Sequence, residues 1–253
     1  MSPNNIILLD IEGTITSKTF VTDTLFPYIK ENLKNYVNDH WNEEELQQDI
    51  SALKKQVEID LQNGLQDCIP IPSFAANNSN VIEVKQSVIQ NVLWQMKLDR
   101  KTTALKSLQG HMWKDGYESK QILGHVYLDA LDAIKKWKSQ NKKIMIYSSG
   151  SVAAQILLFK YSEHGDLTPY FCKHFDTTIG PKKECSSYER IAEDCQAEPS
   201  DFTFYTDSVE EAQAATLAKM NVVLVQRPED TPGDSSSIPS VKIIQTFADA
   251  LFT

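Results

Sequence analysis

The stretch from Ile6 to Thr14 constrains the fold of this chain most, because four large aliphatic residues run directly into an aspartate. Four successive aliphatic side chains are tolerated in a strand whose two faces are both covered, which is typical of parallel sheets. Asp10 follows the carboxyl end of this strand, the edge at which open α/β sheets bind ligands. We therefore expect an α/β fold with a parallel sheet and a polar site beside Asp10.

Asp10 and Glu12 form a pair of carboxylates at this strand end. Residues two apart in an extended chain point the same way, so we expect the two side chains to face one spot. Such a pair is stable when a cation lies between the carboxylates or when one of them keeps a proton. Asp10 is a candidate nucleophile for a phosphoryl group and Glu12 a candidate acid and base. The alternative is that Asp10 only caps a turn.

Composition narrows the class of protein. A length of 253 residues is near the limit of one hydrophobic core, which predicts a domain plus a subdomain. The net charge of −9 disfavours nucleic acid and anionic membranes as partners. The four cysteines lack CxxC spacing, so neither a zinc site nor a redox motif is indicated. Without a long apolar run or a signal-peptide pattern, the sequence predicts a cytoplasmic protein.

Residues 22–108 carry apolar side chains at helical spacing and no convincing strand. We expect helices over 25–41, with Pro27 in the first turn, over 46–61, and over 81–96. We interpret 22–108 as a helical cap inserted after the first strand, and 1–21 with 109–253 as the core. An all-helical N-terminal domain is the alternative, but the Asp10 strand needs a sheet to join. Residues 109–117 are expected to be a hinge, a substrate-contact loop or packing between cap and core.

Further strands of the predicted core also end in polar residues. The strand 143–147 runs into Ser148 and Ser149, whose hydroxyls suit an anion, while Ser151 is expected to cap the next helix. The strand 174–179 leads to Lys182, a candidate fixed positive charge.

A strand ending in Asp207 follows, and 222–225 is the last clear core strand. Glu211 is assigned to a capping box with Ser208, and a second box is expected over 186–189.

These strand ends share one edge in a parallel sheet, and together they suit a phosphomonoester. Asp10 and Asp207 offer the hard oxygen ligands that Mg²⁺ takes. Ser148, Ser149 and Lys182 offer donors to phosphoryl oxygens.

The chain resembles haloacid dehalogenase-like phosphohydrolases in four motifs. These are the stretch Asp10-Ile11-Glu12-Gly13-Thr14, a strand that ends in Ser148, an isolated Lys182, and a strand that ends in Asp207. Most members have a second Asp where this chain has Glu12. That variant, with residues 109–113, 147–151 and 204–207, closely resembles the enolase-phosphatases (acireductone synthases) of methionine salvage. The chain departs from the family pattern at Pro181, where relatives carry histidine, and in the stretch after Asp207.

The resemblance implies a Rossmannoid parallel-sheet core with an inserted helical cap, one Mg²⁺ per subunit, and a monomer in cytoplasm and nucleus. It implies enolisation of 2,3-diketo-5-methylthiopentyl-1-phosphate and then hydrolysis to an acireductone. Asp10 and Glu12 are then the catalytic residues, and Ser148, Ser149 and Lys182 bind substrate. Asp10, Glu12 and Asp207 are the implied metal site, with Glu12 acting through its backbone carbonyl as one option.

Three alternatives remain. The first is a phosphatase or phosphomutase of the same superfamily acting on a sugar or glycolate phosphate, against which Glu12 and residues 109–113 argue. The second is a non-catalytic binding protein on this scaffold. Under that hypothesis Asp10, Lys182 or Asp207 should be missing, and all three are present. The third is a dehalogenase, which has no need of Asp207.

Overall fold

The computed structural model describes residues 5–72, 81–229 and 241–251. The chain divides into two compact units. Met1–Asp23 and Lys120–Thr253 form the sheet unit, and Thr24–Ser119 form the helical unit. None of the helices in the described ranges has the length and apolar character needed to cross a membrane.

The described strands of the sheet unit form one parallel sheet in the order β3-β2-β1-β4-β5-β6. They are β1 (Ile6–Leu9), β2 (Lys143–Tyr147), β3 (Lys173–Phe175), β4 (Phe202–Thr206), β5 (Asn221–Val225) and β6 (Lys242–Ile244). All four residues of β1 are buried, and Leu9 lies between Ile146 and Tyr205 in register. The strand order reverses at β1 and β4, the place where such sheets bind ligands. The α/β prediction is confirmed.

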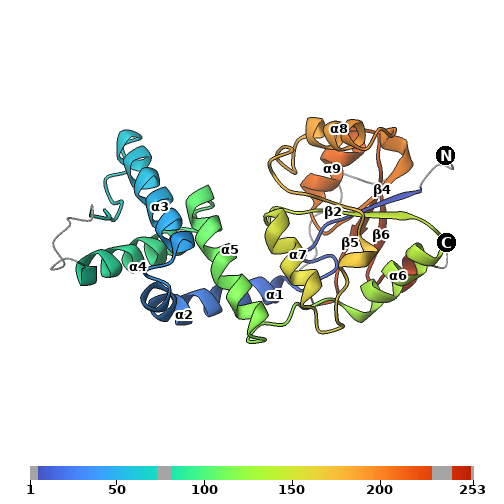
Figure 1. The fold of residues 1–253 in the computed structure, drawn as a ribbon. Helices are drawn as coiled ribbons and strands as arrows, with labels where there is room; N and C mark the ends of the chain where they lie inside the picture. The colour runs from blue at the N-terminus through green and yellow to red at the C-terminus, as the bar shows by residue number, and fades with distance from the viewer. Residues whose placement is uncertain (1–4, 73–80, 230–240, 252–253) are drawn as a thin grey trace. The chain divides into compact units, whose positions relative to one another are not determined.

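Helices cover both faces of this sheet (Figure 1). Helices α8 (Cys185–Asp194) and α9 (Val209–Leu217) cover one face, while α6 (Leu128–Ser139), contacted by α10 (Ala248–Leu251), covers the other. Helix α7 (Val152–Lys160) packs beside β3. Leu128 is 64% exposed, because it is the first residue of α6 rather than part of its packed face.

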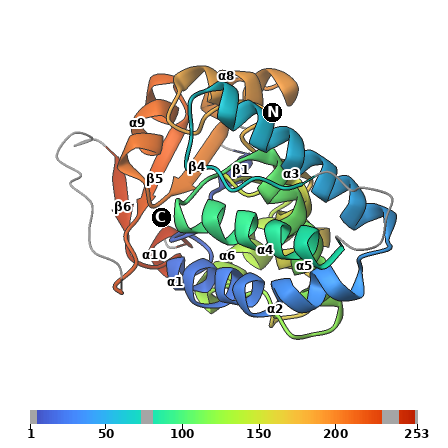
Figure 2. The same cartoon turned by 90° about the vertical axis from the view of Figure 1, so that its left-hand side faces the viewer.

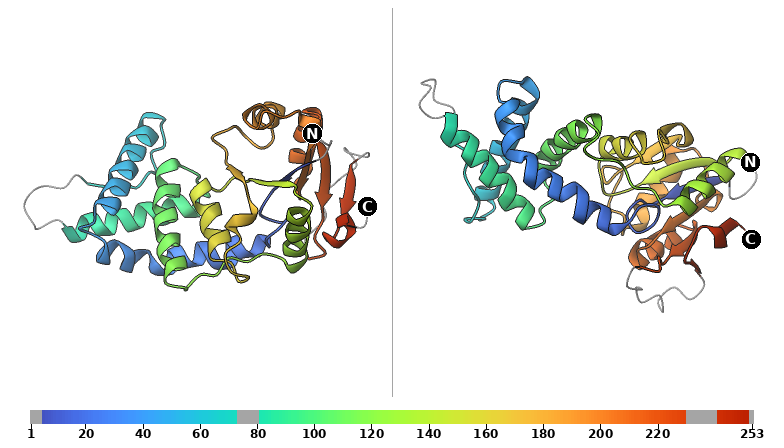
Figure 3. Two further views of the ribbon diagram at one scale, coloured as in Figure 1. Left: turned by 45° about the vertical axis from the view of Figure 1, so that its right-hand side comes forward. Right: turned by 90° about the horizontal axis from the view of Figure 1, so that it is seen from below.

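Four helices make up most of the helical unit and can be followed in Figures 2 and 3. They are α2 (Phe26–Asp39), α3 (Glu44–Gln62), α4 (Val81–Lys97) and α5 (Thr103–Glu118). Helix α5 packs against α2 and α3, and α2 packs against α4. The three helices expected from the apolar spacing are confirmed, with Pro27 in the first turn of α2. Leu61 departs from the expected stripe and is 52% exposed.

Short helical turns precede this unit and interrupt the sheet unit. Lys18–Phe20 form α1, which Ser17 caps, and Val21–Leu25 form a π-helical turn. Thr168–Tyr170 and Pro199–Asp201 are 3₁₀ turns.

Of the interpretations given for residues 109–117, the loop is wrong, because these residues lie within α5. Thr102 caps this helix by accepting a hydrogen bond from the Leu105 backbone N–H (3.2 Å), and Met112 is buried in the core of the helical unit. Burial of an apolar face outweighs the low helix propensity of two glycines. The helical unit accordingly ends after Ser119, where the sequence placed the boundary after residue 108.

Candidate active site

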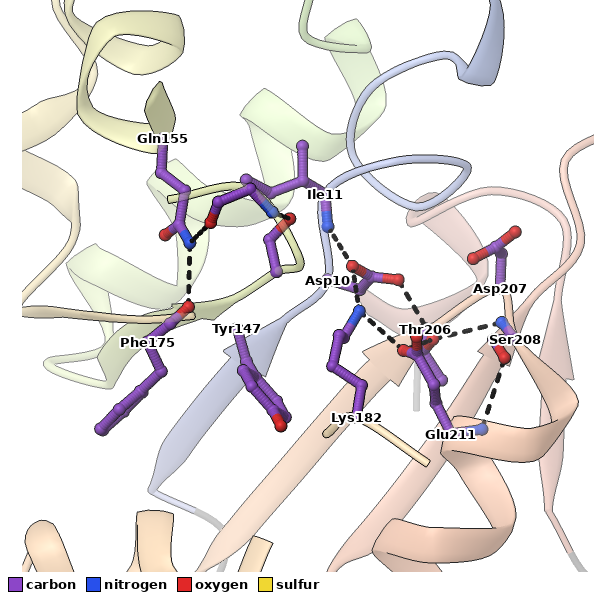
Figure 4. Close-up of polar contacts among 12 residues, drawn as sticks. Asp10, Ile11, Tyr147, Gln155, Phe175, Lys182, Thr206, Asp207, Ser208 and Glu211 are labelled. Atoms are coloured by element: carbon purple, nitrogen blue, oxygen red, sulfur yellow. Dashed lines mark hydrogen bonds and ion pairs between the residues drawn. The ribbon is translucent and has the colours of Figure 1, made fainter. Parts of the chain in front are cut away.

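The Asp10 carboxylate directly follows β1 and is held on both of its oxygens (Figure 4). Oδ1 accepts hydrogen bonds from the Ile11 backbone N–H (2.7 Å) and from Lys182 Nζ (2.6 Å). Oδ2 lies 3.2 Å from the oxygen of the Thr206 hydroxyl. Asp10 is 5% exposed, so these contacts fix a carboxylate that water hardly screens. The turn-cap interpretation accounts for the Ile11 contact alone.

Lys182 reaches Asp10 because its own backbone is held by hydroxyl groups. Tyr147 Oη donates to the Gly180 carbonyl (2.8 Å), Ser187 Oγ to that of Pro181 (2.7 Å), and Tyr188 Oη to that of Lys182 (2.6 Å). Three successive carbonyls are thereby satisfied and the lysine points inward, 9% exposed.

The structure corrects the capping box expected over 186–189. Helix α8 begins at Cys185, and its N-cap residue Glu184 makes no side-chain cap bond. The Ser186 hydroxyl, the cap of the expected box, accepts a hydrogen bond from Arg190 Nη2 (3.0 Å) instead.

Glu211 is a site residue that the sequence reasoning missed. Its backbone N–H does bond to Ser208 Oγ (3.4 Å), as the capping box predicts. Its side chain instead lies 2.7 Å from Lys182 Nζ and accepts from the Thr206 hydroxyl (2.9 Å). The sequence did hold a signal for this role: Glu211 lies in the first turn of the helix that directly follows Asp207.

One ammonium therefore serves two carboxylates. Burial and the charge of Asp10 raise the pKa of Glu211 to about 7, against the opposing effects of Lys182 and Thr206. Burial by itself lowers the pKa of Lys182, but the Asp10 and Glu211 carboxylates outweigh it and raise that pKa above its ordinary value. The cluster holds more negative than positive charge.

Asp207 follows β4, and Lys18 pairs with it, Nζ lying 2.5 Å from Oδ2. Burial and the charge of Asp10 raise the pKa of Asp207, while Lys18 opposes this rise. Gly13 makes room for the pair: its φ is +69°, and a Cβ there would lie 2.5 Å from both Asp207 Oδ2 and Lys18 Cε. Lys18 is a second residue of this site that the sequence reasoning missed.

Glu12 lies on the turn after β1, with an exposed side chain and a backbone bridge to Thr16. The strand ends at Leu9, and the backbone N–H groups of Thr14, Ile15 and Thr16 all bond to the Ile11 carbonyl. The extended geometry that was expected to align Glu12 with Asp10 therefore stops short of Glu12. Its catalytic role stays a prediction.

The Ser148 turn lies at the end of β2. Ser148 is buried; its backbone N–H donates to the Phe175 carbonyl (3.2 Å) and its hydroxyl accepts from the Gly150 N–H (3.3 Å). Ser149 is exposed. Ser151 caps α7 by accepting from the Ala154 N–H (3.3 Å), as predicted.

The carboxylates fit a magnesium ion with few protein ligands. Asp10 and Asp207 are hard oxygen donors, and the effect of Asp10 on the pKa of Asp207 shows that their charges interact. In the described ranges no group of three or more His, Cys, Asp and Glu has a metal-binding arrangement. Two carboxylates suffice for Mg²⁺, which keeps waters and takes substrate phosphate oxygens.

Comparison with known proteins agrees with this geometry. The family model of haloacid dehalogenase-like hydrolases matches residues 5–219. Enolase-phosphatase E1 of Xenopus tropicalis is 50% identical over 226 residues, covering 89% of this chain and 86% of the relative. Enolase-phosphatase E1 of Acyrthosiphon pisum is 47% identical over 249 residues, covering 98% of each.

A solved structure is also similar. The UTR4 protein of Saccharomyces cerevisiae superimposes with a TM-score of 0.75 at 31% identity, over 96% of this chain and 98% of that one. The chain therefore belongs to the haloacid dehalogenase-like hydrolases and, within them, to the enolase-phosphatase E1 family.

Proposed function

We propose that this chain is the enolase-phosphatase of methionine salvage, which converts 2,3-diketo-5-methylthiopentyl-1-phosphate to an acireductone and phosphate. Its family supports a phosphatase that acts on a small phosphorylated substrate. The observation that carries the chemistry is the buried Asp10 carboxylate, 2.6 Å from Lys182 Nζ at the ligand-binding edge of the sheet.

In the proposed phosphatase step, an Asp10 oxygen attacks phosphorus while the bond to the ester oxygen breaks. Glu12 gives a proton to that leaving oxygen. Glu12 then takes a proton from water, whose oxygen attacks the aspartyl phosphate, so that phosphate leaves and Asp10 is restored. Lys182 offsets the repulsion between the Asp10 carboxylate and the anionic phosphate. Ser148 and Ser149 bind the phosphoryl oxygens.

Asp10 and Asp207, with the backbone carbonyl of Glu12, are the proposed ligands of one Mg²⁺. When bound, the ion supplies positive charge at the phosphoryl oxygens. We propose the helical unit as the cap that contributes to substrate choice.

The test is phosphate release from the diketo phosphate, with and without Mg²⁺, for wild type and Asp10→Asn. Acireductone is followed in parallel by its ultraviolet absorbance. We expect metal-dependent release with acireductone in the wild type and none in Asp10→Asn. Asp194→Asn is the matched control, because Asp194 also pairs with a lysine, Lys173, but at the surface.

Near-normal turnover in Asp10→Asn would contradict the nucleophile assignment. Hydrolysis of a generic aryl phosphate without turnover of the diketo phosphate would instead favour the second candidate, a magnesium-dependent phosphatase for another phosphomonoester.

A further inference from the structure

We propose that Gln155 is a positioning residue for phosphate binding, which holds the turn containing Ser148, Ser149 and Gly150 against the end of β3. This inference rests on the proposed function, because it takes that turn as the phosphate site. Gln155 lies in α7, is 2% exposed, and points toward the Phe175 carbonyl (Figure 4).

The side-chain amide of Gln155 adds a second connection between the turn and the end of β3. Nε2 donates one hydrogen to the Gly150 carbonyl (2.8 Å) and one to the Phe175 carbonyl (2.9 Å). The Phe175 carbonyl also accepts from the Ser148 backbone N–H. The turn is thus tied to the end of β3 on both sides of Ser149, once through Ser148 and once through Gly150.

The orientation of this amide is determined by its partners. Both groups at Nε2 are carbonyls, which accept only, so the nitrogen must face them. Oε1 lies 3.1 Å from His174 Nδ1, and burial lowers the pKa of His174 and favours its neutral ring. A neutral ring with its hydrogen on Nδ1 donates to Oε1, which fixes the amide from its other end.

This arrangement leaves the Ser148 hydroxyl able to donate. Its oxygen accepts from the Gly150 N–H, and a hydroxyl that accepts one hydrogen bond still has its own hydrogen to give. Gly150 keeps that position because Gln155 holds its carbonyl. Without the amide donors, the Gly150 carbonyl loses its partner, although Ser148 still bonds to Phe175 and the Val152 N–H, after the turn, still donates to Asp176 (3.2 Å). Gly150 with Ser149 can then move away from the phosphoryl oxygens.

The experiment measures inorganic phosphate as a competitive inhibitor of the full-length enzyme, together with the Mg²⁺ concentration for half-maximal activity and the melting temperature. Gln155→Met keeps the length of the side chain and removes both donors. We expect it to weaken phosphate inhibition about tenfold with unchanged half-saturation by Mg²⁺. Gln155→Glu, which places carboxylate oxygens against two carbonyls, should weaken inhibition further.

Leu158→Ala is the matched control, because Leu158 is a buried residue of α7 whose side chain has no polar group to offer the turn. It should lower the melting temperature and leave phosphate inhibition unchanged. Should the first two variants fail to fold, Gln155→Asn decides, since its amide is one methylene too short to reach both carbonyls.

Phosphate inhibition that is unchanged in folded Gln155 variants, or weakened equally by Leu158→Ala, would overturn the positioning role and leave the proposed function standing. A wild-type enzyme that hydrolyses no phosphomonoester and binds no phosphate would overturn both.

Discussion

Each unit of the protein contains a buried carboxylate paired with a cation, and the two pairs differ in their balance of charge. In the helical unit, Arg100 donates to both oxygens of Asp60 (2.5 and 2.6 Å), and Gln56 adds a third hydrogen bond (2.8 Å). In the sheet unit, Lys182 is shared by Asp10 and Glu211 at 2.6 and 2.7 Å.

The pKa shifts follow this difference. The hydrogen bonds from Arg100 hold the pKa of Asp60 below its ordinary value, so that pair is closed and neutral. Burial and the charge of Asp10 raise the pKa of Glu211 to about 7, because the two carboxylates of that cluster share the single positive charge of Lys182. A balanced buried pair contributes to structure, whereas an unbalanced cluster at a sheet edge is typical of a site that binds a further cation or exchanges protons.

Removing the shared cation should give the largest effect. We expect Lys182→Met to lower phosphate release about 10³-fold, because a fixed positive charge is lost beside the nucleophile. Lys173→Met, which breaks a surface ion pair with Asp194, is the control and should retain activity. If Lys182→Met lowers the rate of phosphate release less than tenfold, another group must supply the positive charge beside the nucleophile.

Removing the balanced cation should affect stability instead. Arg100→Met leaves Asp60 buried without its partner and should lower the free energy of unfolding of the helical unit by about 3 kcal/mol. Urea unfolding followed by tryptophan fluorescence reports this unit, since three of the four tryptophans lie in it.

The difference in unfolding free energy between wild type and Arg100→Met should depend on pH if it comes from the charge of Asp60. The folded pKa of Asp60 lies below 3.8, so its stabilising contribution is present above that pH and is lost as the pH falls through the folded value. The gap between wild type and Arg100→Met should therefore close in acid. A gap independent of pH would point to lost packing of Arg100 against Trp94, whose ring centroid lies 5.0 Å from the guanidinium carbon.

Glu211→Gln should act in the opposite pH direction. The folded pKa of Glu211, about 7, lies above its ordinary 4.5, so its contribution is present below 4.5 and lost as the pH rises through 7. In EDTA, the wild-type free energy of unfolding should fall by about 3 kcal/mol over this range relative to that of Glu211→Gln. Glu210→Gln, at the exposed pair with Lys183, should keep the wild-type slope; equal slopes in wild type and Glu211→Gln would contradict the assignment.

We expect the smallest effect, a change in Mg²⁺ affinity, at Lys18, whose ammonium pairs with Asp207 Oδ2. We expect Lys18→Met to tighten Mg²⁺ binding about threefold, because the metal no longer competes with an ammonium for that oxygen; Lys18 is half-exposed, which keeps the effect small. Titration calorimetry measures the affinity, and Lys183→Met controls for net charge. Unchanged affinity would mean that Lys18 and the metal use different oxygens.

The sequence alone determined the parts that depend on local pattern. The aliphatic run Ile6–Leu9 predicted a buried parallel strand with Asp10 at its carboxyl end, and the apolar stripes predicted three of the helices in the helical unit. Lys182 was expected to point inward because its turn follows another strand. These predictions succeeded because burial imposes a period of two or 3.6 on neighbouring residues.

Tertiary structure decided the rest. The sequence assigned Glu211 to a helix cap and left a loop as one interpretation of residues 109–117, because each pattern had a sufficient local explanation. Lys182 and Asp10 are separated by 172 positions, and three hydroxyls from β2 and α8 hold the backbone around the lysine. Which charges share a buried cation depends on contacts between distant segments, and no local period in the sequence records them.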